Sequence, residues 1–178
     1  MALDKDIIQK QLSEKFGENV SDFRMEVDIL TFHAHSEYIK DIIRYMKEDA
    51  VLRFNFLTDL CGVHYPDNEP DSRFAVVYHL HNWLDNVRVR IKTFLSDEKT
   101  EVDTISDVFA AANWQERETY DFFGIIFKGH PNLKRILNDD AMTVFPMRKD
   151  YPLEDSGRSD KDDRFFGRTT NNYQPTEK

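Results

Sequence analysis

Residues 116–137 of the chain read ERETYDFFGIIFKGHPNLKRIL, a stretch that mixes charged residues, aromatic rings, two glycines and a proline. Such a mixture is costly to bury completely and gains little from full exposure. Arginine, tryptophan, tyrosine and phenylalanine are also the residue types enriched at the energetic centres of protein interfaces. We therefore expect this segment to hold one defined shape against a partner.

The first half of this stretch is predicted to be a helix from Trp114 to Phe123. Asn113 is a candidate N-cap with Glu116 at the N3 position, a variant of the capping box that contributes about 1 kcal/mol. Gly124 suits the left-handed position at which many helices end. Beyond it, Pro131 forbids an ordinary helix, and the apolar spacing of residues 133–137 predicts one further helical turn.

The charged residues of the predicted helix allow two interpretations. Arg117 and Asp121 are four residues apart and can pair on one side of a helix. In the simpler interpretation these charges face solvent. In the other, Glu116, Arg117, Glu118 and Asp121 form a charged network between aromatic rings, and such networks fix one geometry even where they add little stability.

The surrounding sequence predicts an α+β fold, a two-layer domain with a mixed or antiparallel sheet and flanking helices. Apolar residues at helical spacing predict helices, and alternation of apolar with polar residues predicts strands. An Asp-Asn turn at residues 85–86 predicts a β-hairpin. The expected helices are residues 4–16, 36–47 and 105–112, and the expected strands are residues 23–29, 52–62, 74–80 and 87–91.

The composition changes after Phe145. Residues 146–178 are rich in charged residues and poor in aliphatic ones, so this segment alone cannot bury enough apolar surface to offset its ordering entropy. We expect a domain at residues 1–145 and an extended charged tail at residues 146–178 that docks on a partner. The partner contact is assigned to Arg148, Lys149 and Asp150, with Phe165-Phe166-Gly167-Arg168 as an anchor.

Charge and cysteine content narrow the possible functions. The net charge of −9 at pH 7 argues against a nucleic-acid binder and gives no attraction to anionic lipid headgroups. No apolar run approaches the ~18 residues that span a bilayer, and the first residues lack the features of a secretory signal. Cys61 is the single cysteine, which excludes a self-contained four-cysteine cluster or zinc site, and it is expected to be buried and inert.

The segment around residue 116 resembles a motif of the 30 kDa subunit family, the C subunit of respiratory NADH:quinone oxidoreductase (complex I). The resemblance extends over residues 52–153, with departures at His64 and at residues 141–145. So many spaced positions are far more specific than a lone short motif. The matching residues within the motif are Asn113, Trp114, Glu116, Arg117, Glu118, Asp121, Gly124, Phe127, His130, Pro131, Leu133, Arg135, Ile136 and Leu137, followed by residues 146–152.

This resemblance implies structural work inside an enzyme complex. It implies a non-redox subunit of the peripheral arm, on the cytoplasmic side of a bacterial inner membrane, that packs against the large subunit of the quinone pocket. FMN and iron–sulfur clusters would lie in partner subunits, and this chain would hold no catalytic, cofactor-binding or metal-binding residues. Membrane contact would come only through the complex. An equivalent subunit of a membrane-bound hydrogenase or another ion-pumping dehydrogenase is the alternative.

Three further patterns leave other interpretations open. The pairs His33/His35 and His79/His81 would each share a strand face, and on neighbouring strands the four imidazoles could bind zinc or copper. His130 could act as an acid–base pair with Glu116 or Asp121 in a hydrolase. The basic stripe at residues 88, 90 and 92 is either a solvated strand face or a contact for an acidic patch on a partner.

Overall fold

A five-stranded sheet in the order β1-β2-β5-β4-β3 forms the centre of the protein, in a computed structural model that describes residues 3–151. Only β2 and β5 pair in parallel within it, so the sheet is mixed. The α+β prediction is therefore confirmed. The strands are β1 (Val20–Glu26), β2 (Ile29–Ala34), β3 (Phe56–His64), β4 (Phe74–Asn82) and β5 (Val87–Leu95).

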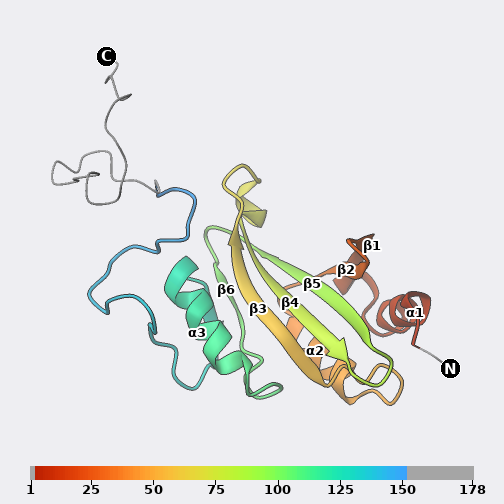
Figure 1. The fold of residues 1–178 in the computed structure, drawn as a ribbon. Helices are drawn as coiled ribbons and strands as arrows, with labels where there is room; N and C mark the ends of the chain where they lie inside the picture. Colours follow the sequence, from red (N-terminus) through yellow and green to blue (C-terminus); the bar gives the residue numbers. More distant parts are fainter. Residues whose placement is uncertain (1–2, 152–178) are drawn as a thin grey trace, which may run out of the picture.

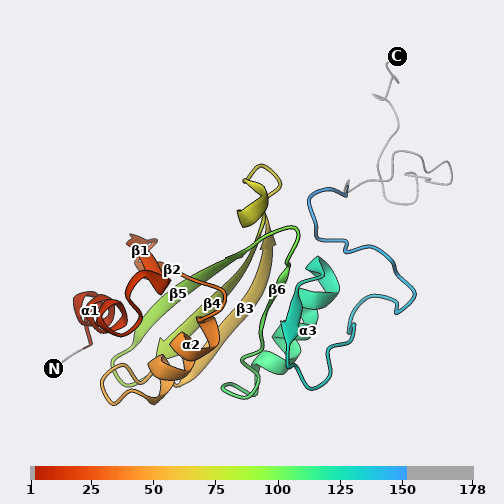
Figure 2. The ribbon, with the colours of Figure 1, turned by 180° about the vertical axis from the view of Figure 1, so that it is seen from behind.

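Helices α1 (Lys5–Phe16) and α2 (Ile39–Glu48) pack against the sheet with their apolar sides, and Figure 2 shows α2 lying across the front of the strands in that view. Helix α3 (Ala112–Phe123) lies beside β3 at the opposite end from α1 (Figure 1). Two short parallel strands, β6 (Glu101–Asp103) and β7 (Ile126–Lys128), join the segments before and after α3. None of the helices in residues 3–151 has the length and apolarity needed to cross a membrane.

The core lies between the sheet and these helices. On α2, the four residues that repeat at helical spacing are all completely buried: Ile39, Ile42, Ile43 and Met46. The facing side of β4 contributes every second residue, as the period of a strand requires: Phe74, Val76, Tyr78 and Leu80.

The strand predicted at residues 23–29 is in fact a hairpin. Strand β1 ends at Glu26, and Val27 and Asp28 both take positive φ (48° and 61°) before β2 begins. Two consecutive left-handed residues are what a tight hairpin turn needs. The apolar Val27, which is 90% exposed, extended the alternating pattern across the turn and concealed it. Within β1 the register with β2 shifts between Ser21 and Arg24.

Two other predicted boundaries are wrong. Leu52 and Phe54 are fully buried but precede β3, because the chain bends at Arg53, which has φ +44°. Residues 105–111 form successive turns instead of a helix, although Ile105, Val108 and Phe109 are buried as expected. In both cases the buried residues belong to a loop. Their apolar side chains happen to have the spacing of a strand or a helix, and the sequence pattern therefore predicted a regular element.

The four-histidine metal hypothesis is wrong because β5 lies between β2 and β4. His79 instead accepts a hydrogen bond from Arg90 (2.8 Å), and His33 lies 3.3 Å from Asp22. Within residues 3–151, no group of three or more histidine, cysteine or acidic side chains is placed to hold a metal ion.

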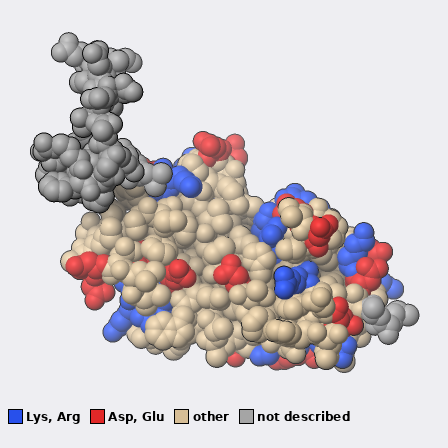
Figure 3. Space-filling model, viewed as in Figure 1, with Lys and Arg blue, Asp and Glu red and all other residues tan. Residues whose placement is uncertain are grey.

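The basic stripe on β5 is largely matched within the chain. Glu26 Oε2 lies 2.9 Å from Lys92 Nζ and 3.2 Å from Arg90 Nη1. The hydrogen bond from Lys92, reinforced by Arg24, lowers the pKa of Glu26 to about 2. Figure 3 shows positive and negative side chains interspersed over this face, with no single basic patch.

Replacing Glu26 with glutamine is expected to lower the free energy of unfolding by about 1 kcal/mol at pH 7, the upper end for pairs that solvent still screens. The folded pKa is lowered, so the contribution is present above pH 4.5 and declines as pH falls toward 2. Urea titrations of the wild type and Glu26→Gln across this range measure the difference. The exposed control Glu18→Gln should be neutral, and a Glu26 effect that does not change with pH would contradict the ion-pair account.

Candidate functional site

Helix α3 buries one side against β3 and ends where the sequence predicts. Gly124 follows it with φ +75° and ψ +21°, the left-handed conformation expected of a terminating glycine. The predicted N-cap is wrong, because the helix begins at Ala112 and Asn113 lies inside its first turn. The Asn113 carbonyl instead accepts a hydrogen bond from His130 Nε2 at 3.1 Å.

Glu116 does not close a capping box but reaches across to the preceding turns. Its side chain is completely buried and contacts Thr104 Oγ1 (2.5 Å) and the Ile105 backbone N–H (2.7 Å). Burial raises the pKa of Glu116 to about 7, although these hydrogen bonds oppose the shift. Glu116 therefore joins α3 to residues 104–105, a contact that local spacing could not reveal.

Asp121 is the second buried carboxylate of α3, and it holds the chain that returns along the helix. Oδ1 accepts hydrogen bonds from Arg135 Nη1 (2.8 Å) and Asn138 Nδ2 (3.1 Å). Oδ2 accepts three backbone N–H groups at 2.8–3.1 Å, those of residues 136, 137 and 138. Burial alone would raise the pKa of Asp121, but these donors hold it well below its usual range.

We call residues 131–151 the strap, because they run back along α3 on the side away from the sheet (Figure 1). The predicted helical turn at residues 133–137 is wrong: this segment is irregular, and its backbone N–H groups converge on Asp121. Leu133 is partly buried against the core, whereas Pro131 is exposed at the start of the strap. The strap is thus fixed by hydrogen bonds to one carboxylate instead of by regular structure.

Arg135, and not Arg117, is the cationic partner of Asp121. Its guanidinium also donates to the carbonyls of Met142 (2.9 Å) and Val144 (3.1 Å), and it lies 5.0 Å from the centre of the Phe145 ring. The predicted Arg117–Asp121 pair is therefore wrong. Arg117 donates instead to two strap carbonyls, those of residues 134 and 135, and stacks at 4.9 Å on the Trp114 ring.

A third arginine fastens the end of the strap. Arg148 Nε donates to the Phe123 carbonyl at 2.7 Å, and its guanidinium lies 4.8 Å from the ring centres of both Phe74 and Phe145. Gly124 makes room for this arrangement, since a Cβ there would lie 2.5 Å from Phe145 Cε2. The Arg148 side chain therefore makes its contacts within the chain, whereas Lys149 and Asp150 next to it are exposed.

The remaining motif residues divide into buried and exposed positions. Phe127 is buried on β7, and His130 accepts a hydrogen bond at Nδ1 from the Asn132 N–H (3.0 Å). Glu118 points outward, and Trp114 is 63% exposed. Large apolar side chains also lie exposed on the strap and next to α3: Ile126, Leu137, Met147 and Tyr151.

The hydrolase interpretation does not fit this geometry. His130 Nε2 lies 3.9 Å from Glu116 Oε2, but both side chains are fully buried, so a substrate cannot reach them. Asp121 is occupied by the strap. Cys61 is half-buried instead of buried, and burial, with Asp59 nearby, raises its pKa to about 11, which disfavours the reactive thiolate.

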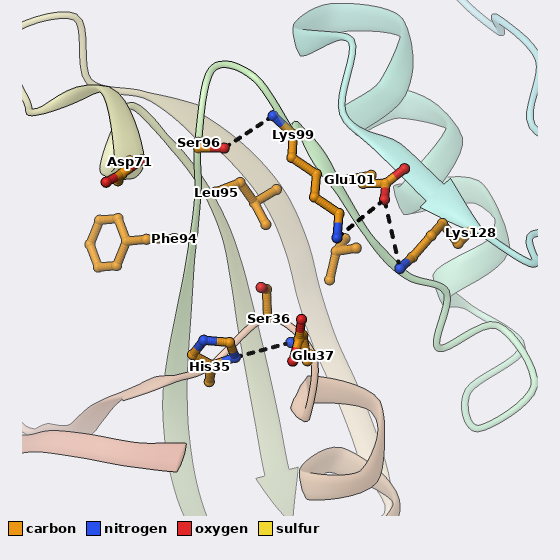
Figure 4. Close-up of a pocket in the computed structure, with 11 residues that line it drawn as sticks. His35, Ser36, Glu37, Asp71, Phe94, Leu95, Ser96, Lys99, Glu101 and Lys128 are labelled. Atoms are coloured by element: carbon orange, nitrogen blue, oxygen red, sulfur yellow. Dashed lines mark hydrogen bonds and ion pairs between the residues drawn. The ribbon is translucent and has the colours of Figure 1, made fainter. Parts of the chain in front are cut away.

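A polar cavity of about 240 Å³ lies apart from these residues, between the end of β5, the start of α2 and the β6-β7 pair (Figure 4). Lys99 and Lys128 line it, and each points to Glu101, at 3.8 and 3.9 Å. The two lysine charges are therefore matched locally, and no residue of the predicted site lines the cavity.

Residues 32–157, which include α3 and the strap, match the model of the family described as "Respiratory-chain NADH dehydrogenase, 30 Kd subunit". The chain belongs to this family. Members with similar sequences include the NADH-quinone oxidoreductase C 2 subunit of Rhizobium etli, 40% identical over 90% of this chain and 83% of that protein. Another is the C subunit of the same enzyme from Roseiflexus castenholzii, which is 38% identical over 86% of this chain and 87% of that protein.

Two solved structures resemble the fold of this 30 Kd family member. The trypsin-resistant fragment of Nqo5 (residues 1–134) is 32% identical, with a TM-score of 0.57 over 71% of this chain and 98% of the fragment. A chain of the archaeal membrane-bound sulfane sulfur reductase is 25% identical, with a TM-score of 0.71 over 97% of both chains. The second similarity covers almost the whole length of both proteins.

Arg135→Ala is expected to lower the free energy of unfolding by about 3 kcal/mol, because it leaves the buried Asp121 carboxylate without its cation. Arg117→Ala is the matched control, expected to cost about 1 kcal/mol because only neutral carbonyl acceptors are released. Urea titrations give both values, and amide hydrogen exchange should show the strap opening in Arg135→Ala. Equal costs for the two variants would contradict the assignment of Asp121 to Arg135.

Gly124→Ala is expected to cost about 3 kcal/mol, since it combines a left-handed backbone with a collision against Phe145. Gly129→Ala separates the two effects, because Gly129 has a similar φ of +77° but its nearest neighbour would lie at an ordinary 3.6 Å. That control should cost about 1 kcal/mol in the same urea assay. Similar losses in both variants would show that backbone strain alone accounts for the effect.

Proposed function

We propose that this chain is a non-redox structural subunit of the peripheral arm of proton-translocating NADH:quinone oxidoreductase. The observation that carries the proposal is the strap, which three arginines and Asp121 hold against α3. A rigid surface loses little entropy when a partner binds. The strap therefore suits a chain whose work is to position its neighbours.

The contact surface is assigned to α3 and the strap, with Trp114 at its centre. Arg117 holds the Trp114 ring by stacking and is itself anchored on strap carbonyls. An exposed, immobilised tryptophan beside an arginine is typical of an interface hot spot. Leu137, Met147, Lys149 and Asp150 extend this surface along the strap. The expected partner is the large subunit of the quinone pocket, with the tail at residues 146–178 continuing over neighbouring subunits.

Catalysis and cofactors are assigned to the partner subunits, with no independent active site in this chain. The one acid–histidine pair of the motif is sealed from solvent, and a single half-buried cysteine offers too few ligands for a cluster. FMN and iron–sulfur clusters would lie in other subunits. The chain would sit at the cytoplasmic side of the inner membrane and contact the membrane only through the complex.

A second candidate is the equivalent subunit of a related respiratory membrane complex, such as a membrane-bound hydrogenase or another ion-pumping dehydrogenase. The similarity to the sulfane sulfur reductase chain, over 97% of both chains, supports this candidate. Both candidates use the chain as a brace, and they differ in the companion subunits. NADH- and FMN-binding companions would favour the first candidate.

The test is purification of the affinity-tagged chain from native membranes, with mass spectrometry of the companions. A Trp114→Ala/Leu137→Ala double variant is expected to retain its fold but lose at least tenfold in recovered companions, because it removes the centre of the proposed surface. Trp83→Ala is the matched control, since Trp83 is 60% exposed on the β4-β5 turn. Full recovery with the double variant, or a chain without membrane companions, would overturn the proposal.

A further inference from the structure

Glu116 has an environment that the interface role does not explain. It lies on the inner side of α3, and its carboxylate contacts Thr104 Oγ1 and the Ile105 N–H. Thr104 Oγ1 in turn lies 2.8 Å from Ser106 Oγ and accepts the Ser106 N–H at 3.1 Å. These contacts form a continuous hydrogen-bonded chain from the helix to the turn that precedes it.

The direction of this hydrogen-bonded chain depends on one proton. The hydroxyls of Thr104 and Ser106 rotate freely about their C–O bonds and can each donate only once. With an ionised Glu116, Ser106 donates to Thr104 and Thr104 donates to the carboxylate. With a protonated Glu116, the acid donates to Thr104 and Thr104 donates to Ser106. Both directions satisfy every contact, so the charge balance around Glu116 decides between them.

The charged groups around Glu116 do not neutralise it. His130 Nε2 is 3.9 Å away, but His130 Nδ1 accepts the Asn132 N–H and Nε2 faces the Asn113 carbonyl, which is the arrangement of a neutral imidazole. From α2, Lys40 lies 3.0 Å from Asp107, whose own negative charge disfavours ionisation of Glu116. The cation on this side is therefore already paired.

The sheet side of Glu116 adds no cation either. Tyr78 on β4 is fully buried, and its pKa is raised well above the usual value by burial and by the charges of Glu116 and Asp103. Its phenol is therefore neutral. An ionised Glu116 would be a buried charge without a counter-ion, which is among the costliest arrangements in a protein interior.

We propose that Glu116 carries a proton in the folded chain in mildly acidic to neutral solution, and that loss of this proton weakens the joint between α3 and residues 104–106. The joint is thus a proton-linked switch built into the base of the helix that carries Trp114. This inference stands on the geometry of the isolated chain and is independent of the proposed complex.

The sign of the pH dependence follows from the raised folded pKa of about 7 against an ordinary value of 4.5. The stabilising contribution is fully present below pH 4.5 and is lost as pH rises toward 7. Glu116→Gln keeps the shape of the side chain and carries a neutral amide, so it removes this dependence. In the full-length chain, the urea midpoint of Glu116→Gln should lie close to that of wild type at pH 5 and exceed it by a much larger margin at pH 8.

Glu118→Gln is the control, because Glu118 is exposed on the same helix and its variant should follow wild type at every pH. A second measurement does not depend on the variants folding: the infrared band of a protonated carboxyl group in wild type should persist to pH 6 and disappear with a midpoint near 7. A midpoint below 5 would overturn the proposal. Equal destabilisation of Glu116→Gln at pH 5 and pH 8 would also overturn it, because it would indicate an ionised, paired carboxylate.

Discussion

The carboxylate of Asp121 is the constraint on which the arrangement of α3 and the strap depends. It gathers five donors, three of them consecutive backbone N–H groups, from a segment that has no regular structure. An irregular segment has no ladder of its own to satisfy these groups, so without this acceptor they would have to turn to water. The Asp121 side chain therefore accepts the backbone N–H groups of the strap, as the carbonyls of a neighbouring strand accept them in a sheet.

The arginines complete this arrangement in a way that lysine could not. The planar guanidinium of Arg135 serves the Asp121 carboxylate and the carbonyls of Met142 and Val144 together, and Arg148 inserts between the Phe74 and Phe145 rings. The strap is thus attached both to α3 and to the start of β4 in the sheet. The exposed face, including Trp114, inherits the rigidity of the core through these contacts.

The sequence predicted structure correctly where the residues of a single helix, strand or turn determine its shape. The α2 face, the β4-β5 hairpin and the end of α3 at Gly124 follow from local spacing and turn chemistry. The pairing within the motif was not predictable, because Asp121 meets Arg135 and Glu116 meets Thr104 across sequence separations of 14 and 12 residues. Local rules place Arg117 near Asp121, but both oxygens of Asp121 already accept donors from the strap, and Arg117 donates to strap carbonyls instead. The predictions at Val27 and at residues 105–111 failed for a related reason. The apolar residues there follow the spacing of a strand or a helix, but they lie in turns.

The irregular pairing of β1 has a consequence for how the protein meets other molecules. β1 is an outer strand of the sheet, yet its register slips beside Asp22, which has φ +53°, and Asp22, Arg24 and Glu26 crowd that margin with charge. An edge strand with an irregular register and charged side chains pairs poorly with the backbone of another chain, which disfavours edge-to-edge aggregation. The opposite margin, β3, is shielded by α3. Recognition must then proceed through side chains, where a choice between partners can be encoded residue by residue.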